Sequence, residues 1–289
     1  MFIKDIFEKK ETVISLEVFP PKPEVPMESV LPAIYDLAKT KPSYMSVTYG
    51  AGGGNTANAL EVSSTIQNDL GVTALQHLTC VGAKRENILS ILENFRKNNI
   101  QNILALRGDF PQGVSFDKES MDYKYAYELI REIKAYGGFC VGGACYPEGH
   151  VENPNKEKDI DNLLYKVEAG VDFLVTQLFF DNNMLYSFLY RLAAKNISVP
   201  VTAGIMPVTT AGSVKRMCAM SGATLTPKFR NMVDKFGDKP EALKQAGIAY
   251  ATEQIIDLIS NGVRRIHIYT MNKPEIAGKI LENISSIIS

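Results

Sequence analysis

The stretch Ser15-Leu16-Glu17-Val18-Phe19-Pro20-Pro21 has the pattern of a β-strand that carries an acid. Strand side chains alternate between two faces. Ile14, Leu16 and Val18 therefore share one face, which we expect to pack against helices. Glu17 lies on the opposite face, near the end of the strand, because the two prolines cannot donate to a sheet ladder.

Glu17 is at odds with its apolar neighbours. A carboxylate buried without a partner is costly and tends to hold its proton. A carboxyl group that is protonated near neutral pH is what general acid catalysis requires. The alternative from this stretch alone is a structural role, in which Glu17 pairs with an arginine or lies at the exposed rim of a sheet.

Apolar segments of strand length alternate with segments of helical period along the whole chain. Strands are expected at 14–19, 44–49, 72–80, 102–107, 139–146, 172–179, 199–205 and 264–270. Helices are expected at 27–40, 55–69, 83–97, 120–136, 155–169 and 182–194, followed by a longer helical region at 210–260 and a last helix from 274. Eight strand–helix repeats predict an α/β fold in which a parallel sheet closes into a (β/α)8 TIM barrel. No linker divides the chain, so we expect a single domain over residues 1–289.

An open, doubly wound sheet is the alternative fold. Such sheets bind dinucleotides through a Gly-x-Gly-x-x-Gly loop after a strand. Gly50-Ala51-Gly52-Gly53-Gly54 follows a strand, but Asn55 stands where the last glycine belongs. A flexible loop is therefore favoured over a phosphate-binding loop at this point.

The composition is that of a globular protein, with 45% hydrophobic and 22% charged residues and a net charge of −1. This balance argues against a nucleic acid or an anionic membrane as partner. No apolar run approaches the length of a membrane span, and the charged start differs from a signal peptide, so we expect a cytoplasmic protein. Four cysteines without a Cys-x-x-Cys pair and only three histidines argue against a metal site and favour reduced, buried thiols.

Polar residues gather at the predicted strand exits, which is where (β/α)8 enzymes place their active sites. Arg107-Gly108-Asp109 follows an apolar strand, and such a trio can grip a phosphate with the arginine while the aspartate meets a heterocycle. An internal Arg107–Asp109 ion pair is the alternative. The helix at 155–169 carries Asp159, Asn162 and Lys166 on one stripe, for which its residues alone favour a solvated face.

The exits taken together resemble those of methylenetetrahydrofolate reductases, in the same order, from about residue 13 to residue 272. Besides the opening stretch, the motifs are Ser46-Val47-Thr48-Tyr49-Gly50-Ala51, Gln76-His77-Leu78-Thr79-Cys80, Leu104-Ala105-Leu106-Arg107-Gly108-Asp109, Tyr146-Pro147-Glu148, Thr176-Gln177 and Tyr269-Thr270-Met271-Asn272. The resemblance covers the catalytic barrel and not the additional regulatory domain of eukaryotic relatives.

The resemblance implies a flavoprotein of one-carbon metabolism that serves methionine biosynthesis. NADH or NADPH would reduce FAD, and methylenetetrahydrofolate would then accept hydride from the reduced flavin in a ping-pong sequence. Glu17 corresponds to the acid that protonates the 10-nitrogen of the folate and so opens its five-membered ring to an iminium. Asp109 corresponds to the residue between pterin and flavin. In this reading the flavin performs the hydride transfer, while the protein supplies orientation, a proton and electrostatics.

The resemblance also assigns binding positions. Gln177 falls on a position that meets folate or nicotinamide, Tyr269 on a folate-side position, and Lys273 near the folate glutamate tail. The positions that correspond to FAD contacts are Thr48, Tyr49, Ala51, His77, Arg107, Gly108, Asp109, Ala126, Tyr146, His150, Asp159, Asn162 and Lys166.

Three residues depart from the family pattern. Ala211 stands where well-known bacterial members have an aromatic residue, Lys273 where they have an arginine, and Tyr165 where a FAD-side arginine is found. The missing aromatic residue opens an alternative, a flavin-carrying subunit that receives electrons from a partner protein. A methyl or pteroate transferase acting on a pterin without flavin is a third class, and a homo-oligomer is compatible with the sequence.

Overall fold

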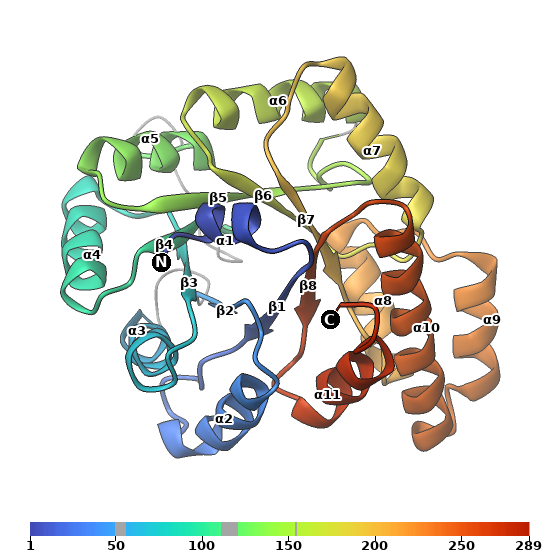
Figure 1. The fold of residues 1–289 in the computed structure, drawn as a ribbon. Coiled ribbons are helices and arrows are strands. Elements are labelled where there is room, and N and C mark those ends of the chain that lie inside the picture. Colours follow the sequence, from blue (N-terminus) through green and yellow to red (C-terminus); the bar gives the residue numbers. More distant parts are fainter. Residues whose placement is uncertain (50–55, 111–120, 154, 289) are drawn as a thin grey trace.

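The computed structural model describes residues 1–49, 56–110, 121–153 and 155–288. Eight parallel strands, hydrogen-bonded in chain order, close into a barrel surrounded by helices (Figure 1). The predicted (β/α)8 fold is confirmed. The strands are β1 (Val13–Val18), β2 (Tyr44–Val47), β3 (Ala74–Thr79), β4 (Asn102–Leu106), β5 (Cys140–Cys145), β6 (Phe173–Thr176), β7 (Val201–Ile205) and β8 (Arg265–Tyr269).

The helices follow the strands at nearly every predicted place. They are α1 (Ile3–Lys9), α2 (Leu31–Lys39), α3 (Thr56–Ser64), α4 (Arg85–Lys97), α5 (Ala126–Tyr136), α6 (Lys156–Glu168), α7 (Asn182–Ala194), α8 (Ala211–Ser221), α9 (Pro227–Phe236), α10 (Pro240–Ser260) and α11 (Pro274–Asn283). A 3₁₀ turn precedes α2 at Met27–Ser29, and a π-helical turn extends α3 over Thr65–Asp69.

Helix α1 was not expected from the sequence. It lies across one end of the barrel (Figure 1), where Ile3, Ile6 and Phe7 are buried against residues at the amino ends of the strands. The buried Asn102 side chain, at the start of β4, accepts a hydrogen bond of 2.8 Å from the backbone N–H of Ile3. This end is therefore plugged, and the strand exits form the opposite end.

The longer helical region expected at 210–260 consists of three helices, α8, α9 and α10. Gly222 ends α8 in the left-handed conformation, with φ of 73°, which a glycine adopts without strain. Pro227 and Pro240 begin the next two helices, where a missing backbone N–H costs nothing. The helical period was read correctly, but these breaks were overlooked.

The two faces of β1 point as predicted. Ile14, Leu16 and Val18 belong to the main apolar core together with Ile34 and Leu37 of α2. The other face of the strand points into the barrel.

Packing inside the barrel requires a glycine at position 142 of β5, because a Cβ atom on Gly142 would approach the ring of Phe173 to 2.6 Å.

Three of the four cysteines are buried, and burial raises the pKa of the Cys80, Cys140 and Cys145 thiols to about 12. These thiols are therefore protonated and unreactive at neutral pH. Within the described ranges, no helix has both the length and the apolar character needed to cross a membrane.

Candidate active site

Glu17 lies inside the barrel towards the strand exits, with only 6% of its surface exposed. Its backbone pairs with Ser46 of β2 and Tyr269 of β8. Its Oε2 atom is 3.6 Å from Nε2 of His77 and 3.5 Å from Nε2 of His267. Neither structural alternative describes this residue, since its neighbours are two imidazoles and it is not at an exposed rim.

His267 in β8 is a site residue that the sequence reading did not single out. Its Nδ1 atom is 2.8 Å from the hydroxyl of Ser15, and that hydroxyl donates its single proton to the carbonyl of Ile266 at 3.1 Å. Its Nε2 atom faces Glu17 and also lies 3.3 Å from the hydroxyl of Ser46. The signal was available, because His267 and Tyr269 share the inward face of one strand.

His77 in β3 is buried and completes the surroundings of Glu17. Burial lowers the pKa of His77 to about 4, although the nearby Glu17 acts in the opposite direction. The ring is therefore neutral at pH 7. Within the described part of the chain, its Nε2 atom has no hydrogen-bond partner. An unpartnered buried nitrogen next to a buried acid marks a place where a ligand is expected.

Arg107 follows β4 and makes a bidentate ion pair with Glu152, in which both N–O distances are 2.7 Å. The alternative of an internal Arg107–Asp109 pair is not what the structure shows, because Asp109 is exposed and the guanidinium fork holds Glu152. Gly108 between them adopts φ of 83°. A Cβ atom there would lie 2.9 Å from Thr79, so glycine is required on both grounds.

The segment after β5 and helix α6 meet beside Arg107. The backbone N–H of His150 donates to Asp159 at 3.2 Å, and Nζ of Lys166 donates to the carbonyl of Ala144 at 2.5 Å. Burial lowers the pKa of Lys166, and it raises the pKa of Tyr146 to about 12. The three residues predicted to share one face of α6 therefore differ in exposure. Asp159 and Lys166 are half-buried, whereas Asn162 is exposed.

The residues assigned to the folate side lie at the exits of β6 and β8. The hydroxyl of Tyr269 donates to the carbonyl of Thr176 at 2.6 Å. The backbone N–H of Gln177 donates to Cys145 at 2.7 Å, and Nζ of Lys273 donates to Thr209 at 3.3 Å. The structure therefore brings these residues to the same end of the barrel as Glu17.

The remaining assigned positions follow β2 or begin α5. The N–H of Thr48 donates to Val18 at 3.1 Å, the hydroxyl of Tyr49 is 2.7 Å from that of Thr56, and Ala126 is the first residue of α5. Ala51 lies outside the described residues.

Two of the residues that depart from the family pattern, Ala211 and Tyr165, lie on helices that follow the strands. Ala211 is half-buried at the first turn of α8. Tyr165 is 49% exposed on α6, with its ring 5.4 Å from that of Tyr127.

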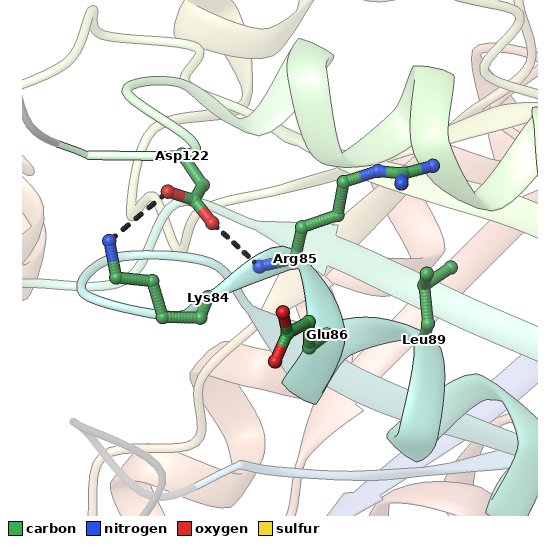
Figure 2. Close-up of a pocket in the computed structure, with 5 residues that line it drawn as sticks. All are labelled: Lys84, Arg85, Glu86, Leu89 and Asp122. Carbon is green, nitrogen blue, oxygen red and sulfur yellow. Dashed lines mark hydrogen bonds and ion pairs between the residues drawn. The ribbon is translucent and has the colours of Figure 1, made fainter.

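A surface pocket between α4 and the segment before α5 has a structural explanation (Figure 2). Its Asp122 carboxylate accepts from the backbone N–H of Arg85 at 2.8 Å and from Nζ of Lys84 at 3.2 Å. These contacts lower the pKa of Asp122 and satisfy the first turn of α4. Arg85 itself is bidentate to Glu132. The pocket is therefore a helix-capping arrangement.

A (β/α)8 barrel in which a buried glutamate near the strand exits contacts two imidazoles has the architecture of a barrel enzyme. The chain belongs to the methylenetetrahydrofolate reductase family, whose model matches residues 2–285. This is a family of oxidoreductases that act on folate in one-carbon metabolism.

Bacterial relatives match the chain over most of their own length. The 5,10-methylenetetrahydrofolate reductase of Pectobacterium carotovorum is 33% identical over 271 residues, which cover 94% of this chain and 89% of that protein. The enzyme of the same name from Escherichia coli is 32% identical, with 94% and 90% covered. Methylenetetrahydrofolate reductase (NADH) 1 of Arabidopsis thaliana is 33% identical over 99% of this chain, and the chain spans about half the length of that relative (50%).

A solved structure supports the fold independently. It is an uncharacterized protein from Clostridium thermocellum, described as binding two copies of 5-methyl-5,6,7,8-tetrahydrofolic acid. It covers 99% of both chains with a TM-score of 0.65 at 14% identity.

Proposed function

We propose that this protein reduces 5,10-methylenetetrahydrofolate to 5-methyltetrahydrofolate with FAD as cofactor and NADH or NADPH as electron donor, and that Glu17 is its general acid. The observation that carries the proposal is the position of Glu17, buried near the strand exits between His77 and His267. Family membership and the bacterial relatives supply the reaction, and the geometry supplies the residue that would deliver its proton.

The residues around the strand exits fit a flavin dinucleotide. Arg107 and Lys166 bring basic groups to one side of the exits, as the phosphates of a dinucleotide require. Burial lowers the pKa of the neighbouring His150, whose imidazole would contribute there as a hydrogen-bonding group. Nε2 of His77 is a buried nitrogen without a partner in the described chain, and it suits a polar edge of a ring. When bound, FAD would supply the hydride chemistry, which amino-acid side chains cannot perform.

The protein's own part in the reaction is proton delivery and placement. Glu17, when protonated, would give its proton to the 10-nitrogen of the folate, and acid catalysis of this kind contributes about 10²–10⁴-fold. His267 would hold the carboxyl group in place through its Nε2 atom. Gln177, Tyr269 and Lys273 would orient the folate. Such placement of reactants contributes much of the remaining acceleration.

Asp109 would lie between the pterin and the flavin, as the resemblance implies. Its carboxylate is exposed and is not committed to the Arg107 fork, which binds Glu152 instead. A negative charge near the reacting rings would stabilise the cationic iminium of the substrate. Glu17 and Asp109 thus have different surroundings, one buried and one in water, as an acid and a charged stabiliser require.

The visible spectrum tests this function directly. We expect the purified protein to be yellow, to bleach with NADH or NADPH under anaerobic conditions, and to regain its colour when methylenetetrahydrofolate is added. A colourless protein that takes up no FAD would overturn the proposal and would favour a pterin enzyme without flavin.

Electron delivery by a partner protein is a second candidate, supported by Ala211. The small side chain at the first turn of α8 offers no ring on which a nicotinamide could stack. In that case the flavin would bleach with dithionite but not with NADH or NADPH, and activity would require a redox protein supplied in trans.

A further inference from the structure

The sheet hydrogen bonds on the β8 side of the acid end at the acid itself. Glu17 and Tyr269 form the last pair in the register between β1 and β8. Pro20 and Pro21 cannot donate to a ladder, so the backbone does not extend this pairing. The chain that follows Glu17 must therefore be held on this side by other groups.

Two side chains of the turn after β8 take the place of further ladder bonds. The hydroxyl of Thr270 donates to the carbonyl of Glu17 at 2.6 Å. The side-chain amide of Asn272 donates to the carbonyl of Phe19 at 2.8 Å and accepts from the N–H of the same residue at 2.9 Å. An amide that meets both polar groups of one residue reproduces the paired bonds of a sheet. We refer to Thr270 and Asn272 as the exit clamp.

The two clamp residues also bind each other and belong to a strained turn. The N–H of Asn272 donates to the hydroxyl oxygen of Thr270 at 3.2 Å. Met271 and Asn272 adopt φ of 53° and 54°, in the left-handed region that few residues other than glycine visit. Strained backbone of this kind persists where surrounding contacts fix it, and it is concentrated at functional sites. The bonds from the exit clamp to β1 are contacts that fix this turn.

The opposite side of the same segment is held by backbone contacts. Glu17 pairs with Ser46 in β2, and the carbonyl of Val18 accepts from the N–H of Thr48 at 3.1 Å. The chain from Glu17 to Phe19 is thus tied on both sides, and side chains supply the half that faces β8. A displacement of a catalytic group by about 1 Å can slow a reaction about 10²-fold, so loss of that half should be felt at the carboxyl group.

We propose that the exit clamp positions the general acid: Thr270 and Asn272 fix the main chain on the β8 side of Glu17 and so keep its carboxyl group between the two imidazoles. The inference rests on the proposed function, because that function gives Glu17 a proton to deliver. Both are positioning residues, since they bind the backbone of β1. Asparagine suits its place, because aspartate lacks the donor and glutamine has one more methylene group.

Two matched substitutions at Thr270 test the proposal by stopped-flow absorbance of the flavin. Valine keeps nearly the same shape without the hydroxyl, and serine keeps the hydroxyl. We expect Thr270→Val to slow reduction of methylenetetrahydrofolate about tenfold and Thr270→Ser to stay within about threefold of the wild type. Reduction of the flavin by the nucleotide should be unchanged in both. Equal slowing of the two half-reactions, or no difference between the two variants, would overturn the proposal.

The route through Glu17 is tested by combining substitutions. In a Glu17→Gln protein, which has no proton to deliver at this position, adding Thr270→Val should slow the folate half-reaction no further. A further tenfold loss would show that Thr270 acts on the reaction independently of the acid, and would contradict its assignment as a positioning residue.

Thr252→Val is the control for loss of a buried hydroxyl. Thr252 lies in α10 with 8% of its surface exposed, and its hydroxyl accepts from Nδ2 of Asn283 at 3.3 Å. We expect both half-reactions to keep their rates, because this contact joins α10 to α11 and does not involve β1. A slowing equal to that of Thr270→Val would reduce the effect to lost stability and count against the exit clamp.

Hydrogen exchange separates the exit clamp from the proposed function, because it needs neither flavin nor folate. Asn272→Gly removes the amide of the clamp, and glycine adopts φ of 54° without strain. We expect mass spectrometry of the full-length, flavin-free protein to show loss of protection in peptides that contain Phe19, while peptides from β5 stay protected. Unchanged exchange would overturn the proposal alone. Loss of protection in a protein that takes up no FAD would overturn the proposed function, and the catalytic role of the clamp with it.

Discussion

Nε2 of His267 lies 3.5 Å from Oε2 of Glu17, although 250 residues separate the two along the chain. They meet because β1 pairs with β8, with Ser15 opposite His267 in the register. The Nδ1 atom of the same ring is 2.8 Å from the hydroxyl of Ser15, so the imidazole is contacted at both nitrogens.

Glu17→Gln should separate the two half-reactions. The amide is nearly isosteric with the acid but cannot give up a proton. We expect reduction of methylenetetrahydrofolate to fall by about 10²–10⁴-fold, while reduction of the flavin by the nucleotide is preserved. Anaerobic stopped-flow absorbance of the flavin measures both steps. Equal losses in the two steps would show that Glu17 serves structure or cofactor binding and not acid catalysis.

His267→Gln should act through Glu17. We expect the folate half-reaction to slow about tenfold and its pH profile to move, because the group that fixes the acid is altered. Reduction of the flavin is the internal control and should keep its rate. A slower reaction with an unchanged pH profile would indicate a packing role only, and the assignment of His267 as a positioning residue would be dropped.

The buried, neutral His77 should make the fold sensitive to acid. Its pKa of about 4 lies below the ordinary value of 6.5, so the unfolded chain binds more protons between these two values. The free energy of unfolding should therefore fall as the pH drops through this window, by about 3 kcal/mol between pH 7 and pH 4.

Urea unfolding of the wild type and of His77→Gln over this range isolates the contribution. The variant lacks the titrating group, so the difference in stability between the two proteins should shift in its favour at low pH. Parallel pH dependences would contradict the prediction.

Gly204 should not tolerate a methyl group. A Cβ atom there would approach the carbonyl of Thr176 and the hydroxyl of Tyr269 to 2.6 Å each, which would break the hydrogen bond between them. We expect Gly204→Ala to cost about 1–3 kcal/mol in urea unfolding and to raise the KM for folate.

Gly278→Ala is the control for that substitution. A Cβ atom there meets nothing within 4 Å, and the residue lies inside α11. Alanine in a helix interior should stabilise the protein by about 0.5–1 kcal/mol. Similar behaviour of the two variants would show that the close approach at Gly204 relaxes without cost.

Local patterns were sufficient for the strands and for most helix positions, because periodicity and turn residues act within a few residues of each other. Local patterns did not predict an element whose formation depends on contacts with distant parts of the chain. Helix α1 is short, and it is stabilised by burying Ile3 and Phe7 against the barrel and by the contact with Asn102. The breaks at Gly222, Pro227 and Pro240 were visible in the sequence but were overlooked within a long helical period.

The candidate site was likewise predicted only in part from the sequence. The inward direction of Glu17 followed from strand alternation. The roles of the individual residues came from resemblance and stay predictions. The partner of Arg107 could not be predicted, because Asp109 is nearer in sequence, whereas Glu152 is brought to the guanidinium by the segment after the next strand.

By itself, the sequence determined the barrel, the strand that carries the acid and the face on which the acid lies, since all three depend on the alternation and order of residues along the chain. Only the tertiary structure decided what surrounds that acid. Closure of β1 against β8 brings His267 to Glu17, and β3, which lies beyond β2 in the barrel, brings His77. Contacts between residues so far apart in the chain depend on the register of the closed sheet, which no local pattern specifies.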